Sequence, residues 1–138
     1  MNLTTYKSNW SASCTAVSGV ETFTADELTT VNLNNIDYSL VLMLPPQDIS
    51  LPEKNYQRNQ FNTVLYIINK KSQATGDEVV IEWSRMQGLL QEALDTMLTK
   101  TNVIASDGNR AWDYFDEVIG GNSLLSVRLG INIVTQNC

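Results

Sequence analysis

The clearest hydrophobic pattern lies near the C-terminal end, where apolar and polar residues alternate from Ser123 to Thr135. The apolar positions are Leu125, Val127, Leu129, Ile131 and Ile133. A period of two over this length predicts a half-buried antiparallel strand. At roughly 3.4 Å per residue the strand would extend about 40 Å, more than a small domain needs, which indicates that it reaches beyond its own subunit.

A second pattern has the period of a helix. The segment Thr75-Gly76-Asp77-Glu78 has the form of a capping box, with Thr75 as the N-cap. After it, apolar residues recur at spacings of three and four, at Val79, Trp83, Met86, Leu90, Ala93, Leu94, Met97 and Leu98. This pattern predicts an amphipathic helix that runs to about Thr99 and packs this face on a sheet.

Three further segments have the composition of strands. Tyr38–Leu44 is an apolar run that Pro45 ends, which is typical of a strand buried on both faces. Gln60–Asn69 is rich in β-branched and aromatic residues, and Ala111–Ile119 mixes aromatic residues with acids. In Gln60–Asn69, one face is predicted to carry Phe61, Leu65 and Ile67, and the other face Val64, Tyr66 and Ile68.

The remaining segments give weaker signals. Residues 1–19 are rich in Ser, Thr and Asn, and we expect an irregular N-terminal arm, in which Tyr6 and Trp10 could serve as docking residues. A capping box at Thr24–Glu27 predicts a short helix from about Ala25 to Val31. The stretch from Pro45 to Asn59 is expected to be a long polar connection.

These elements predict a single α+β domain over residues 20–138. Their order is short helix, strand, strand, long helix, strand, strand. A mostly antiparallel four-stranded sheet with one long amphipathic helix packed on it satisfies this order.

The composition argues against most catalytic chemistry. The 138 residues contain no histidine, which removes the usual general base and the commonest metal ligand. Asp113, Asp116 and Glu117 are interpreted as solvated surface residues, although an enzyme that uses carboxylates alone stays an alternative. Neither Cys14 nor Cys138 belongs to a CxxC motif. We therefore expect no enzyme activity, no metal and no cofactor.

Charge and hydropathy limit the partners. Nine basic residues face fifteen acidic ones, for a net charge of -6, and the basic residues are scattered. A protein that binds nucleic acid tightly needs clustered Lys and Arg, so we expect no specific DNA or RNA binding. No apolar run approaches the roughly 18 residues that a membrane span needs, so no membrane partner is expected.

The strand pattern also carries a resemblance. The segments Asp37–Pro46 and Phe61–Asn69, followed by Trp83-Ser84 and a last strand ending at Asn137-Cys138, resemble small virion proteins of crAss-like and related tailed phages of Bacteroidetes. Such proteins are similar to tail-terminator and head–tail joining proteins, which form rings in the neck between portal and tail. The resemblance implies a structural, cofactor-free homo-oligomer of the virion, assembled in the bacterial host cytoplasm beside portal, neck or tail proteins.

Two sets of residues are candidates for subunit contacts. Lys54, Tyr56 and Arg58 would give the connection after Pro45 a cationic, aromatic tip that an acidic neighbour attracts, and a solvated hairpin tip is the alternative. Trp112 and Tyr114 share one face of a strand, where a core role and an interface role both remain open. In a ring, a negatively charged lumen would let DNA pass without binding. The alternative function is a small monomeric binding or adaptor module encoded by a mobile element.

Overall fold

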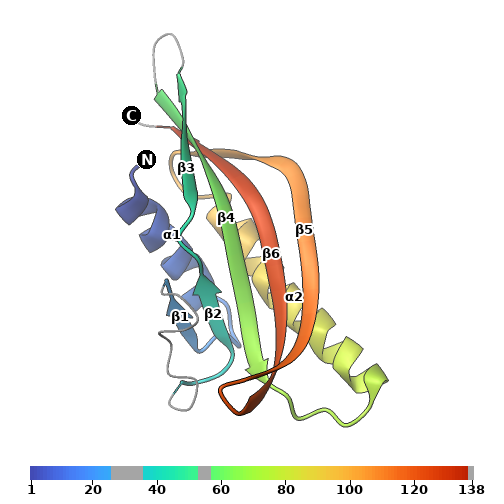
Figure 1. Ribbon diagram of the computed structural model, residues 1–138. Helices are drawn as coiled ribbons and strands as arrows, with labels where there is room; N and C mark the ends of the chain where they lie inside the picture. The colour runs from blue at the N-terminus through green and yellow to red at the C-terminus, as the bar shows by residue number, and fades with distance from the viewer. Residues whose placement is uncertain (26–35, 53–56, 137–138) are drawn as a thin grey trace.

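The computed structural model describes residues 1–25, 36–52 and 57–136, in which two helices cover one face of a mixed sheet (Figure 1). In chain order the elements are α1 (Leu3–Thr15), β1 (Thr22–Thr24), β2 (Leu40–Met43), β3 (Gln47–Pro52), β4 (Gln57–Lys70), α2 (Gly76–Met97), β5 (Val103–Ile119) and β6 (Asn122–Gln136). The α+β class is confirmed. The expected four-stranded sheet is wrong, because β1 and β3 bring the described strands to six.

The sheet has the strand order β1-β2-β4-β6-β5, and β3 also pairs with β4. β2 occupies one half of β4, at Leu65–Ile68, and β3 occupies the other half, at Gln57–Asn62. All these pairings are antiparallel except that of β1 with β2. Pro45 and Pro46 lie between β2 and β3, where a residue without an N–H group suits the break between two strands.

The long polar connection expected from Pro45 to Asn59 is therefore mostly regular structure. Six of its residues form β3, which pairs in continuous register with β4 from Gln47↔Asn62 to Pro52↔Gln57. The polar composition concealed the strand, because β3 lies at the edge of the sheet and buries none of its side chains fully. Main-chain hydrogen bonds to β4, rather than an apolar face, stabilise it.

The core lies between the helices and the sheet. The alternation predicted for the two longest strand segments is confirmed, and the face of β4 and β6 toward the helices carries Phe61, Leu65, Ile67, Leu125, Val127, Leu129, Ile131 and Ile133. α2 contributes Met86, Leu90, Leu94 and Met97, each without exposed surface. Trp83 is only partly buried. The capping prediction holds, since the Thr75 side chain accepts a hydrogen bond from the backbone N–H of Glu78.

The irregular arm expected over residues 1–19 is wrong, because Leu3–Thr15 forms helix α1. Its N-cap is Asn2, whose Oδ1 accepts a hydrogen bond of 2.8 Å from the backbone N–H of Thr5. Tyr6, Trp10 and Cys14 follow one another at intervals of four and are fully buried in the core between the helices and the sheet. This apolar stripe is one residue wide, and a helix with so little apolar surface is stable only through its tertiary contacts.

Tyr6 is the main contact of α1 with the sheet. Its ring stacks on Phe61 of β4 with 4.0 Å between centroids, and its hydroxyl lies 2.5 Å from Oγ1 of Thr63. The short helix expected from Ala25 to Val31 lies almost entirely outside the described residues. The single-domain division of the chain stays a prediction.

Candidate assembly interface

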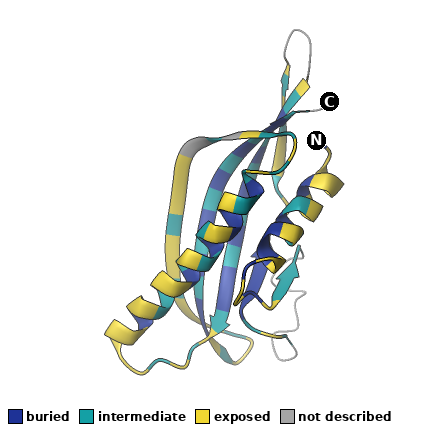
Figure 2. Cartoon of the chain, turned by 180° about the vertical axis from the view of Figure 1, so that it is seen from behind, coloured by how far each residue is buried: buried dark blue, intermediate teal, exposed yellow. Residues whose placement is uncertain are grey.

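β5 forms one edge of the sheet and is its longest strand. On one side it pairs with β6, and the described part of the chain places no strand on its other side. Figure 2 shows β5 as the mostly exposed strand beside the largely buried β6. The N–H and C=O groups of an open edge are a template for pairing with another chain, so this edge is a candidate contact surface.

The two halves of β5 differ in regularity. Its pairing with β6 shifts register between Val103 and Ala105 and again between Ser106 and Arg110. Irregularities of this kind bend a strand and hinder edge-to-edge pairing. From Arg110 to Ile119 the register is continuous. The regular half is therefore the part of the edge that can accept another strand.

An apolar groove runs beside this half of β5. Val80, Trp83 and Ser84 of α2 and Tyr114 of β5 line a hollow of about 360 Å³. Val80 is 55% exposed, Ile81 69%, Tyr114 45% and Val118 71%. Val80 and Tyr114 line the groove, and Ile81 and Val118 belong to the same two elements; exposed apolar side chains mark contact sites where they adjoin one another.

Hydrogen bonds and ring contacts fix the geometry of this groove. The indole Nε1 of Trp83 donates to the backbone oxygen of Phe115 at 3.1 Å. The hydroxyl of Tyr114 donates to Oε1 of Gln87, and the rings of Trp83 and Tyr114 lie 5.7 Å apart. The surface beside the edge is thus held in place before any partner arrives, which lowers the entropy lost on binding.

The structure separates the two aromatic candidates on β5. Trp112 is partly buried and packs against the core, whereas Tyr114 is exposed and lines the groove. Sequence reasoning missed Val80 and Ile81, which lie outside the apolar stripe of α2. The sequence feature that could have identified them is a pair of adjacent apolar residues outside that stripe, at positions where a solvated helix face carries polar residues.

The other three interface candidates remain untested. Lys54 and Tyr56 lie outside the described residues. Arg58 is in β4, opposite Leu51 of β3 and Gln136 of β6, and is half-buried. Along β6, its partner Gln136 lies seven residues, or about 24 Å, from Leu129, which is the partner of Trp112. Arg58 therefore does not share one surface with Trp112 and Tyr114 within a single chain.

Asp113 and Asp116 of β5 do not form a catalytic pair. Oδ2 of Asp113 lies 3.1 Å from Nη1 of Arg128, and Oδ2 of Asp116 lies 2.7 Å from Nζ of Lys71. The two carboxylates occupy positions of opposite parity on the strand, so they lie on opposite faces of the sheet. Over residues 1–25, 36–52 and 57–136, no three His, Cys, Asp or Glu side chains lie together as metal ligands would. Neither described helix has the length and apolar character of a membrane span.

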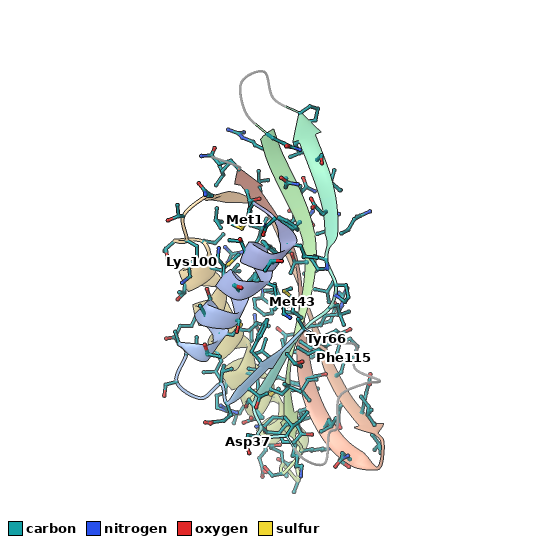
Figure 3. The ribbon with its side chains drawn as sticks, turned by 90° about the vertical axis from the view of Figure 1, so that its left-hand side faces the viewer. Met1, Asp37, Met43, Tyr66, Lys100 and Phe115 are labelled. Carbon is teal, nitrogen blue, oxygen red and sulfur yellow. The ribbon has the colours of Figure 1, made fainter. Side chains whose placement is uncertain are left out.

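The face of the sheet away from the helices has a smaller apolar cluster. Leu40, Leu42, Ile68 and Leu124 are buried there, which confirms that β2 is buried on both faces. Beside them, Tyr66 and Phe115 line a hollow of about 100 Å³ with 6.3 Å between ring centroids (Figure 3). Phe115 lies on β5, so both faces of the regular half of β5 carry aromatic surface.

Comparison with solved structures gives a likeness in the path of the backbone. No protein-family model matches the chain, and no curated protein matches it. A chain of a solved structure described as the virion of a native gene transfer agent particle is similar, with a TM-score of 0.49 and 11% sequence identity. The match covers 90% of this chain and 84% of that chain. It concerns the path of the backbone and assigns no role. The resemblance to proteins of crAss-like phages stays a prediction.

Proposed function

We propose that this protein is a structural subunit of a tailed, phage-like virion, where copies of it form a ring in the neck between portal and tail. The observation that carries the proposal is the regular, open half of β5 beside the groove lined by Val80, Trp83 and Tyr114. An isolated protein exposes such an edge to aggregation, whereas a subunit of an ordered assembly uses it.

The charge of the chain supports the same role. The net charge is -6, and two of the basic residues, Lys71 and Arg128, are already ion-paired with acids of β5. A ring of such subunits has a negative lumen, which repels DNA phosphates and lets the genome pass without specific binding. The role requires no catalysis and no cofactor, and the partners would be portal, neck or tail proteins.

The proposal is tested by deleting the gene from the phage or phage-like element that encodes it and restoring it from a plasmid. We expect the deletion to leave DNA-filled heads and tails unjoined, and electron microscopy of restored particles with a tagged chain to place density at the neck. Mass measurement of the native protein should give a large multiple of 15.4 kDa.

Other outcomes would contradict the proposal. A monomeric binding or adaptor module would remain near one or two copies of 15.4 kDa, would be absent from purified particles, and its deletion would leave particles intact. A catalytic role would appear as an activity that Asp113→Asn, Asp116→Asn or Glu117→Gln abolishes. Either result would reject the structural role.

A further inference from the structure

The hydrogen bonds of β6 show which residues of β5 present their backbone to the open edge. The N–H of Lys71 donates to the oxygen of Ser123, and the N–H of Gln136 donates to the oxygen of Asn102. In an antiparallel ladder the backbone groups of successive residues face opposite sides, so odd-numbered residues of β6 face β4 and even-numbered ones face β5. The β5 residues that lie opposite odd-numbered β6 residues in the regular half therefore face outward. They are Arg110, Trp112, Tyr114, Asp116 and Val118.

A second open edge lies on the opposite side of the same sheet. β3 pairs only with β4 among the described strands. The N–H of Leu44 donates to the oxygen of Val64, so even-numbered residues of β4 face β2 and β3. The β3 residues that lie opposite odd-numbered residues of β4 therefore face outward, and they are Asp48, Ser50 and Pro52. Proline is suited to such a position, since its missing N–H would face away from the sheet.

These two edges match in direction, face and length. Across the sheet each strand runs opposite to its neighbour from β3 through β4 and β6 to β5, so β3 and β5 run in opposite directions. The outward residues of both strands carry their side chains on the helix side, because Asp48 pairs with Phe61 and Trp112 with Leu129 of the core. The six residues of β3 and the segment from Trp112 to Val118 each span roughly 20 Å.

We propose that β3 of one copy pairs in antiparallel fashion with the Trp112–Val118 segment of β5 in the next copy. The contact continues the sheet from subunit to subunit, head to tail, with the groove between α2 and β5 covered by the incoming β3–β4 hairpin. It deepens the proposed ring function and rests on it, since a head-to-tail contact closes into a ring when its rotation permits.

Charge disfavours one symmetric pairing of β5 with itself. In the register that places Tyr114 opposite Asp116, Asp113 of each copy lies opposite Glu117 of the other, and like charges directly opposite are destabilising. β3 contains a single acid, Asp48. Arg58 of β4, opposite Leu51 of β3, lies on the same face of the sheet as Glu117, so the pairing brings a cation toward the acidic residues of β5.

The first test mixes two chains, each with one introduced cysteine, in a Cys138→Ser background. One chain carries Ser50→Cys, and the other carries a cysteine at Tyr114, Asp116 or Val118 in turn, so the introduced cysteine is the single exposed one beside the fully buried Cys14. Outward residues of paired strands lie directly opposite, at Cα distances that a disulfide can bridge. We expect oxidation to cross-link the mixed pair for at least one of the three positions. Cross-linking of the β5 variants only with themselves would show symmetric pairing and overturn the proposal.

The second test removes one outward N–H. Val118→Pro deletes a donor that faces away from β6, so the chain should keep its fold while association weakens at least tenfold. Val118→Thr is the matched control, because threonine is also β-branched and keeps the N–H, and it should associate like the parent. Circular dichroism and urea unfolding of dilute protein verify the fold of both variants.

The outcomes separate this proposal from the ring function. Suppose that the parent forms a ring, that Val118→Pro leaves this ring intact, and that no mixed cross-link forms. Another surface then joins the subunits, so the β3–β5 contact is wrong while the ring function stands. If the parent stays monomeric, is absent from particles and forms no mixed cross-link, both proposals fail. A mixed cross-link together with dissociation of Val118→Pro supports the contact.

Discussion

Truncating Leu90 measures how tightly α2 packs on the sheet. Leu90 lies in the middle of α2, has no exposed surface and belongs to the main core cluster. Leu90→Ala removes three buried carbon groups, for a transfer cost of about 2.4 kcal/mol at roughly 0.8 kcal/mol each. The cavity left between helix and sheet adds to this, so we expect the free energy of unfolding to fall by about 2–5 kcal/mol.

Urea unfolding, followed by circular dichroism and by tryptophan fluorescence, measures this change. Ile81→Ala is the matched control, because it also removes three carbons from α2, but from a side chain that is 69% exposed. At concentrations where the chain is monomeric, the control should change stability by no more than about 0.5 kcal/mol. Equal midpoints for Leu90→Ala and the parent would remove Leu90 from the core and would require α2 to be rotated about its axis.

Three further predictions concern buried or ion-paired groups. Tyr6→Phe should lower the free energy of unfolding by about 1 kcal/mol, because it removes the hydrogen bond with Thr63; unchanged stability would contradict that bond. Burial raises the pKa of the Cys14 thiol to about 12. With the other cysteine changed to serine, a thiol reagent at about pH 8 should therefore react with Cys14 only when urea unfolds the chain. Rapid labelling of the native protein would refute this. Hydrogen bonds from Arg85 lower the pKa of Glu82. The ionised carboxylate therefore stabilises the folded chain at pH values above the usual glutamate pKa near 4.5, and this stabilisation is lost as the pH falls through the lowered pKa. Glu82→Gln should therefore shift the urea midpoint at neutral pH and lose this effect in acid, whereas an equal shift at both would show that the charge plays no part.

Part of the interface could be read from the sequence. Aromatic residues at alternate positions of a strand with acidic neighbours identified Tyr114, which lies on the groove beside the open edge. The same argument selected Trp112, which packs against the core instead. Both residues face the helix side of β5, and only the position of α2 above the strand decides which of them it covers.

The sequence by itself determined the elements whose side-chain pattern is strongly periodic. The alternation in β4 and β6, and the apolar stripe of α2, each bury one continuous face, so their positions and faces could be predicted without knowledge of the fold. Strong periodicity is a local property, because each of these segments buries enough apolar surface to define its own orientation.

Only the tertiary structure decided the elements that lack such a face. α1 is helical because Tyr6, Trp10 and Cys14 are buried in the core, and its remaining residues are too polar to indicate a buried face. β3 is a strand because the edge of β4 offers backbone partners to a polar segment. The open edge of β5 likewise follows from strand order, which depends on contacts between distant segments that no local pattern encodes.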